Sequence, residues 1–219
     1  MSSQRKFPFL NIVLAIAALA MLGLAFIHSE NKKPLRILPI YGEKEYNANT
    51  KDTDYHTVMP FKMIDQLGQT VTLDTFKNKI FVANFFYATC PGICKKMNSQ
   101  LESATKSFIG NTKVKFVSYT VDPIRDSVPV LFNYAQMHDA VPYQWYFLTG
   151  NKKEIYELAH KSYYAAVDDS ASMNFVHTDN MVLIDTHDRI RGVYKGTDSA
   201  DVSRMVVDIK LLLQEDPTR

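Results

Sequence analysis

The sequence predicts an α/β protein in which helices flank a central sheet, preceded by a β-hairpin and by a single N-terminal transmembrane helix. Two features support this prediction. Apolar runs of strand length alternate with segments whose apolar residues recur at helical spacing, and one long segment near the start carries no charge. The chain has 219 residues, 46% of them hydrophobic and 22% charged, which suffices for one well-packed domain of roughly 150 residues. A formal net charge of +2 gives no reason to expect a nucleic-acid partner.

The uncharged segment spans residues 7–27. A helix of that length, at about 1.5 Å per residue, matches the roughly 30 Å hydrocarbon core of a bilayer. A cleavable signal peptide is the alternative, but its apolar region is usually about 7–15 residues long, so we predict an uncleaved anchor after a short cytoplasmic N-terminus, residues 1–6. Positive charges flank the segment almost equally, and long C-terminal domains translocate largely regardless of such charges. We therefore expect a bacterial inner-membrane protein, single pass, with its domain on the periplasmic side.

Residues 28–58 are polar and irregular in pattern and contain two prolines and Gly42, so we predict a tether between the membrane and the domain. The domain is predicted to span residues 59–219. It begins with a pattern typical of a β-hairpin that turns at Gly68.

The rest of the domain alternates strands with helices. A continuous apolar run at residues 79–87 suits a buried central strand, and helical spacing follows as far as Phe108, where Gly110 supplies a stop. A helix from Ser127 tolerates a proline in its first turn, and Asn151 begins another with a capping-box pattern. The remaining elements are predicted strands at 113–122 and 143–150, a hairpin at 180–196 that turns near Asp188, and a helix at 202–213. A thioredoxin-like sandwich fits this order.

Both cysteines stand in the stretch "FFYATCPGICKKM", at positions 90 and 94. A proline after Cys90 is favoured at the first helical position, so we expect the Cys90 thiol at a helix N-terminus, which favours the thiolate. In a helix, four steps of about 1.5 Å place Cys94 one turn away on the same face. The offset of about 6 Å lies near the long end of the Cα separations that a disulfide accepts. It suits two sulfur ligands of one metal ion at least as well.

Three interpretations of the cysteine pair stay open at this point: a structural disulfide, a redox pair and a metal site. The structural disulfide is the least favoured, because a domain of this size gains little from closing so short a loop. Of the six histidines, His177 differs from the others because it comes immediately before a strand that we expect to be buried. We expect a parallel neighbour to bring its loop beside the turn that holds the cysteines.

Several sequence blocks follow one another in order across most of the predicted domain: "FFYATCPGICKKM", "YTVDPIRDSVPVLFNYA", "WYFLTG", and "VHTDNMVLID" with "RGVYKG". In these blocks and their order the chain resembles the SCO/SenC family of copper-binding proteins. The resemblance implies that Cys90, Cys94 and His177 bind copper, and that Asp122 is a secondary candidate near the site. The family often has a tyrosine and an aspartate just before the histidine, where this chain has a phenylalanine and a valine.

The chemistry of these ligand types agrees with copper. Soft thiolates select Cu(I), a neutral imidazole completes a three-coordinate site, and the same set accepts Cu(II) if oxygen or nitrogen donors add to it. A zinc hydrolase is not favoured, because no glutamate or histidine is placed to act as a base on a zinc-bound water. The resemblance implies a metallochaperone that delivers copper to the copper A centre of cytochrome c oxidase. Its partners would be the copper A subunit of the oxidase and a copper-donor protein.

The main alternative is a thiol–disulfide oxidoreductase, with Cys90 and Cys94 as the catalytic pair, acting on cysteines of the oxidase subunit or of another extracytoplasmic protein. Thioredoxin-type enzymes carry a cis-proline that faces a CxxC pair, whereas here the spacing is CxxxC and no proline occurs between Pro142 and Pro217. A peroxiredoxin is less favoured, because Tyr87 stands where that family needs a threonine. A copper or redox sensor stays open as a third class. We therefore predict a metallochaperone rather than an enzyme.

Overall fold

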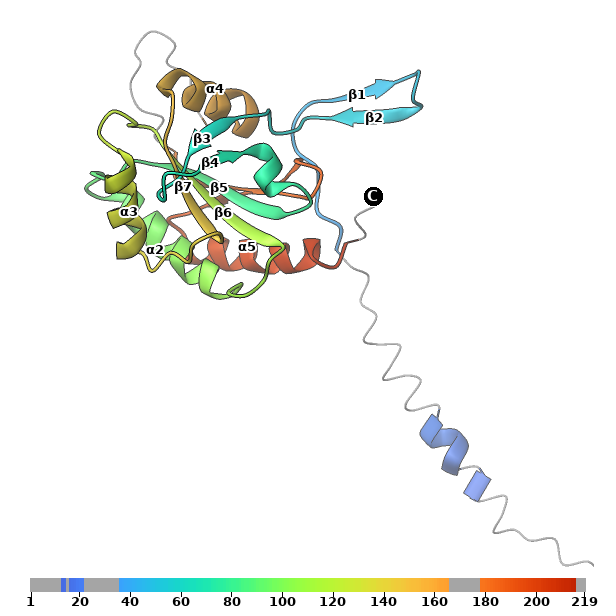
Figure 1. Ribbon diagram of the computed structural model, residues 1–219. Helices are drawn as coiled ribbons and strands as arrows, with labels where there is room; N and C mark the ends of the chain where they lie inside the picture. Colours follow the sequence, from blue (N-terminus) through green and yellow to red (C-terminus); the bar gives the residue numbers. More distant parts are fainter. Residues whose placement is uncertain (1–12, 15, 22–35, 166–177, 216–219) are drawn as a thin grey trace, which may run out of the picture. The chain divides into compact units, whose positions relative to one another are not determined.

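The computed structural model describes residues 13–14, 16–21, 36–165 and 178–215, which are drawn in colour in Figure 1. The described residues from Ile37 onward belong to one compact unit. Within the described ranges, no helix has the length and the hydropathy needed to cross a bilayer. Most of the predicted anchor at residues 7–27 lies outside these ranges, so the anchor stays a prediction.

A five-stranded sheet with the order β7-β6-β5-β8-β9 forms the centre of the described domain (Figure 1). Its strands are β5 (Ile80–Phe86), β6 (Val114–Thr120), β7 (Trp145–Leu148), β8 (Asn180–Ile184) and β9 (Ile190–Lys195). β5, β6 and β7 run parallel, whereas β8 pairs antiparallel with both β5 and β9. Every residue of β5 is buried, as expected for a central strand covered on both faces. The predicted alternation of parallel strands with helices, closed by an antiparallel hairpin, is confirmed.

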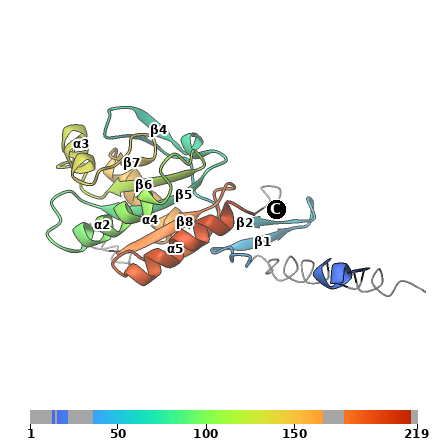
Figure 2. The same cartoon turned by 90° about the horizontal axis from the view of Figure 1, so that it is seen from below.

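Helices cover both faces of the sheet. They are α2 (Ile93–Lys106), α3 (Val128–Met137), α4 (Lys152–Tyr163), α5 (Ser199–Leu212) and the short 3-10 helix η1 (Leu73–Phe76). Figure 1 shows α4 on one side of the sheet and α2 and α5 on the other, and Figure 2 shows α2 and α5 lying along each other. Alternate residues of a strand face opposite sides, so Val82 joins the apolar core under α2 and α5 whereas Phe81 joins the core under α4.

At two places a local sequence feature sets a turn or a helix start where it was predicted. The hairpin before the sheet is present as β3 (Lys62–Ile64) and β4 (Thr70–Thr72). It turns at Gly68, whose φ of +77° is a conformation that glycine adopts without steric cost. The Asn151 side chain accepts the N–H groups of two residues in the first turn of α4 at 2.9 and 3.3 Å, which satisfies donors that a helix start leaves free.

The stretch before the domain differs from its prediction as an irregular tether. β1 (Lys44–Asn47) pairs antiparallel with β2 (Asp52–Tyr55), and Figure 1 shows this hairpin projecting from the rest of the domain. Leu38 and Val58, on either side of the hairpin, are buried in the two cores. The hairpin has no hydrophobic periodicity because its strands are almost entirely exposed. Main-chain hydrogen bonds rather than apolar burial hold it together.

Candidate metal centre

The two cysteines lie where β5 leads into α2. Cys90 lies in the loop after β5, and Cys94 lies in the first turn of α2. The prediction that Pro91 begins the helix is wrong, because the helix begins two residues later, at Ile93. The Cys90 N–H donates to the carbonyl oxygen of Tyr87 at 3.1 Å, and this turn sends the chain through a bend before helical hydrogen bonding starts.

The two thiols are close together and shielded from solvent. Cys90 is 3% exposed and Cys94 is 4% exposed, and no disulfide joins them. The backbone N–H of Cys94 donates to the Cys90 sulfur at 3.4 Å, so Cys90 receives one of the free N–H groups of the first helical turn. The thiols are close together, as predicted, but they are not one turn apart in a single helix, because Cys90 lies in the loop that precedes α2. Their role as metal ligands stays a prediction.

The two thiols differ in acidity. Burial raises the pKa of the Cys90 thiol, but hydrogen bonds from the Cys94 thiol, from the N–H groups of Gly92 and Cys94 and from the Tyr87 hydroxyl outweigh burial and lower that pKa overall. Burial, together with the hydrogen bond to Cys90, raises the pKa of Cys94 to about 12. Cys90 therefore ionises first, and the Cys94 S–H stabilises its thiolate.

Apolar and aromatic side chains surround the thiols. Phe86, Met97 and Tyr134 belong to the same core as both cysteines, and the rings of Phe86 and Tyr134 stack with their centroids 5.0 Å apart. Burial raises the pKa of Tyr134 to about 12, so the hydroxyl is neutral and accepts a hydrogen bond from Asn98 at 2.9 Å. A thiolate in such surroundings is costly without a bound cation. The surroundings therefore favour a soft metal ion or a disulfide over two free thiolates.

The secondary candidate Asp122 has a partner other than the cysteines. Its Oδ2 accepts a hydrogen bond from Arg125 Nη1 at 3.3 Å, and its carbonyl oxygen accepts the backbone N–H of Asp126 at 2.9 Å. In the described part of the chain, no hydrogen bond or ion pair joins Asp122 to Cys90 or Cys94. A direct role for Asp122 at the thiols therefore stays a prediction.

Asp126, which the sequence did not single out, fastens the cysteine loop. It is buried, and its Oδ2 accepts the N–H of Ala88 at 3.0 Å and the hydroxyl of Thr120. Ala88 lies two residues before Cys90, so the Asp126 carboxylate joins the β6–α3 loop to the loop that carries the first thiol. Asp126 and Tyr87 both stand in the motif blocks quoted above. That membership is the one indication by which sequence alone could have found them.

The third predicted ligand, His177, lies outside the described residues, which resume at Thr178. The expectation that a parallel neighbour brings its loop to the cysteines is wrong, because β8 runs antiparallel to β5, with Met181 opposite Asn84. Antiparallel pairing puts the start of β8 beside the end of β5 that leads to the cysteines. Parallel pairing would have put the start of β8 at the far end of the sheet.

Packing around Gly196 brings the chain that follows His177 next to α2. A Cβ atom on Gly196 would lie 2.7 Å from Met97 Cγ and 2.9 Å from the carbonyl oxygen of Asp179. The Gly196 N–H donates to that same carbonyl oxygen at 2.6 Å. Met97 follows Cys94 by three residues and Asp179 follows His177 by two. The described chain therefore resumes close to the helical turn after Cys94.

The donors present suit a copper ion. Within the described ranges, no three His, Cys, Asp or Glu side chains are grouped so that they could hold a metal ion. The cysteine pair supplies two sulfur donors, which are soft and suit Cu(I), in a place from which water is largely excluded. Among the described residues no His, Asp or Glu side chain joins the pair as a third donor, and His177 lies outside them.

Known proteins share this sequence and fold. Residues 49–214 match the family model described as SCO1/SenC. The "SCO1 protein homolog" of Bacillus subtilis (strain 168) is 28% identical over 163 residues, which cover 73% of this chain and 84% of that protein.

Two solved structures are similar to this chain in both sequence and fold. BsSco, described as a member of the Sco family of cytochrome c oxidase assembly proteins with a disulfide switch, is 26% identical with a TM-score of 0.64, over 74% of this chain and 95% of that one. Arabidopsis thaliana ScoI with copper bound is 25% identical with a TM-score of 0.58, over 73% of this chain and 99% of that one. The predicted α/β, thioredoxin-like fold is thereby confirmed.

Proposed function

Since the chain belongs to the SCO1/SenC family, we propose that it is a membrane-anchored copper metallochaperone that assists assembly of the copper A centre of cytochrome c oxidase. One observation carries the proposal: two free, buried thiols lie within contact of each other at a helix N-terminus, and one of them ionises first. The relatives support it, because BsSco is described as belonging to a family of oxidase assembly proteins and Arabidopsis thaliana ScoI is described with copper bound.

Copper is the cargo in this proposal, and Cys90, Cys94 and His177 hold it. The Cys90 thiolate is stabilised before metal arrives, by the N–H donors of the helix start and by the Tyr87 hydroxyl. Binding of Cu(I) replaces the Cys94 proton, whose removal is otherwise unfavourable in so buried a place. The imidazole of His177 completes a three-coordinate site for Cu(I), and further oxygen or nitrogen donors would be needed for Cu(II). Transfer to the oxidase subunit proceeds by exchange of these ligands for those of the acceptor.

The proposed location follows from the uncharged segment. Residues 7–27 anchor the chain in the bacterial inner membrane, residues 28–58 link the anchor to the domain, and the domain at residues 59–219 lies on the periplasmic side. The partners are the copper A subunit of the oxidase and a copper-donor protein.

A thiol–disulfide oxidoreductase is the second candidate, because the acidity difference between the thiols also suits redox chemistry. Cys90, with its lowered pKa, would attack a disulfide of the oxidase subunit, and Cys94 would resolve the mixed disulfide. The spacing CxxxC and the lack of any proline between Pro142 and Pro217 favour the metallochaperone.

The metal site is tested by a Cu(I) competition titration of the full chain in detergent. We expect His177→Ala to weaken Cu(I) binding by more than the roughly 10–100-fold that loss of an outer-shell partner typically costs. His160→Ala, an exposed histidine on α4, is the matched control and should bind as the wild type does. Both variants should still form the Cys90–Cys94 disulfide on mild oxidation. Equal Cu(I) affinity in the His177 variant and the wild type would remove the histidine from the site.

The biological role is tested by deleting the gene and measuring the copper content of the oxidase. If the chain is a metallochaperone, added copper should restore the copper content of the oxidase in the deletion strain, at least in part. Restoration by an added reductant alone would instead favour the oxidoreductase.

A further inference from the structure

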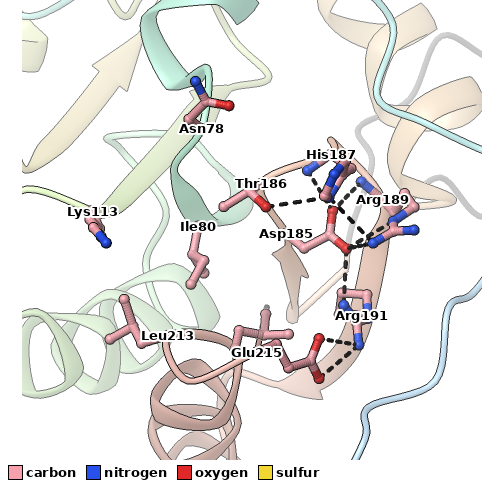
Figure 3. Close-up of a pocket in the computed structure, with 11 residues that line it drawn as sticks. Asn78, Ile80, Lys113, Asp185, Thr186, His187, Arg189, Arg191, Leu213 and Glu215 are labelled. Carbon is pink, nitrogen blue, oxygen red and sulfur yellow. Dashed lines mark hydrogen bonds and ion pairs between the residues drawn. The ribbon is translucent and has the colours of Figure 1, made fainter. Parts of the chain in front are cut away.

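A cavity of about 370 Å³ lies at the end of the sheet opposite the cysteines. Ile80, the first residue of β5, lines it, whereas Cys90 follows the last residue of that strand. The seven residues of β5, at about 3.3 Å each, separate the two places by roughly 20 Å. Figure 3 shows Asn78 and Lys113 on one side of the cavity and the turn between β8 and β9, with His187, on the other. The cavity is therefore separate from the metal centre.

The two carboxylates in the cavity wall are engaged within the protein. Arg191, whose side chain is 4% exposed, donates to Asp185 at 3.0 Å and to Glu215 at 2.9 Å (Figure 3). Asp185 also accepts the backbone N–H groups of His187 and Arg189 at 2.9 and 3.1 Å, and the Arg189 side chain at 2.9 Å. Three Lys or Arg side chains line the cavity against these two carboxylates, which leaves one positive charge in excess. The wall therefore favours an anion.

Three polar side chains keep hydrogen-bonding capacity for a ligand. Among the described residues, the Lys113 ammonium and the Asn78 amide have no hydrogen-bond partner. Nδ1 of His187 lies 3.3 Å from the Thr186 hydroxyl and 3.4 Å from the Arg189 guanidinium. Because both of these groups can donate, Nδ1 is the acceptor and Nε2 carries the proton. Lys113, Asn78 and His187 are thus three donors on facing walls.

We propose that this cavity binds an organic phosphate. A phosphate group is tetrahedral, so its terminal oxygens, three in a monoester and two in a phospholipid diester, can accept from donors on facing walls, whereas a carboxylate carries its two oxygens on one planar carbon. The cavity is also within the usual size range of small-molecule sites, about 300–1,000 Å³, and exceeds what a bare phosphate fills. Ile80, Leu212 and Leu213 supply the apolar part of the wall, against which the organic part of the ligand packs.

Two sources share this chemistry: a soluble organic phosphate and the headgroup of a phospholipid. Arg191 donates to the carbonyl oxygens of Leu38 and Pro39 at 2.8 and 3.2 Å, so the cavity lies beside the point where the N-terminal chain joins the domain. The uncharged segment ends at Ile27, and the ten residues after it can reach at most about 36 Å. The lipid source depends on the proposed membrane anchor, whereas the soluble source does not.

The soluble source is tested on the full chain in maltoside micelles, titrated with sn-glycerol 3-phosphate and with inorganic phosphate by calorimetry. We expect saturable binding, weakened about tenfold or more in Lys113→Met, which loses a charged hydrogen bond. Asn78→Gly should also weaken binding, and glycine tolerates the φ of +58° at that position. Lys153→Met, at an exposed position on α4, is the control and should bind as the wild type does.

The lipid source is tested by reconstituting the chain in phosphatidylglycerol vesicles and measuring the acetylation of Lys113 relative to Lys153 by mass spectrometry. Slower acetylation of Lys113 than in maltoside micelles, reversed by Asn78→Gly, supports the lipid headgroup. Saturable glycerol 3-phosphate binding that depends on Lys113 supports the soluble ligand. The proposal is overturned if neither probe acts, if glycerol 3-phosphate binds but Lys113→Met binds it as tightly as the wild type, or if vesicles protect Lys113 but Asn78→Gly leaves that protection unchanged.

Discussion

Removal of the Asp126 carboxylate should weaken copper binding although Asp126 touches neither thiol. In Asp126→Ala, the Ala88 N–H and the buried Thr120 hydroxyl lose their common acceptor. Each unsatisfied group costs about 1–3 kcal/mol. The wild-type carboxylate is itself destabilised, because burial raises its pKa and its Oδ1 has no hydrogen-bond partner among the described residues. We therefore expect a net loss of about 2 kcal/mol in the free energy of unfolding.

The same change releases the loop two residues before Cys90, so Cu(I) affinity should fall by roughly 10–100-fold, the usual effect of an outer-shell change. The assays are urea unfolding and Cu(I) competition titration at a pH where the variant is fully folded. Asp126→Asn retains one oxygen acceptor and should lose less on both measures. Asp122→Ala, which removes an ion pair whose Arg125 side chain is largely exposed, should change stability by about 0–1 kcal/mol. An Asp126→Ala variant that is destabilised but binds Cu(I) as tightly as the wild type would show that the Asp126–Ala88 hydrogen bond has no part in copper binding.

Three further predictions follow from the geometry. At neutral pH the metal-free chain should react with iodoacetamide mainly at Cys90, because the pKa of Cys94 is raised to about 12; equal labelling of both thiols by mass spectrometry would contradict the assigned order of ionisation. Burial and the Asp185 carboxylate raise the pKa of Asp188 to about 6, so stability should fall as the pH rises from about 4 to about 6. Asp188→Asn should remove that fall and add about 1 kcal/mol at pH 7, because Asp188 is only half-buried and solvent screens its charge, with no gain below about pH 4 in urea unfolding. Gly196→Ala would place a Cβ atom 2.7 Å from the Met97 side chain of α2 and 2.9 Å from the carbonyl oxygen of Asp179. It should lower the free energy of unfolding by about 1–3 kcal/mol and weaken Cu(I) binding. Unchanged values in urea unfolding and in the Cu(I) titration would count against the packing described.

Only part of the metal centre could be found in the sequence. Cys90 and Cys94 are close in the chain, and a helix start next to a buried strand brings their thiols together whatever the rest of the fold does. Asp126 was missed because its contact with Ala88 joins two loops that follow different strands, and no local pattern reports such a contact. His177 stays a prediction from the family resemblance, since it lies outside the described residues.

The order of strands and helices, the turn at Gly68 and the cap at Asn151 were determined by the sequence itself, because each depends on the chemistry of a few neighbouring residues. The direction of β8 was decided only by the tertiary structure. A strand buried on both faces has the same apolar composition whether its neighbour runs parallel or antiparallel. The sequence of β8 therefore does not indicate which end of the strand lies beside the cysteines. The hydrogen-bonded pairing of β8 with β5 decides that, and with it the side of the sheet from which the chain after His177 approaches α2.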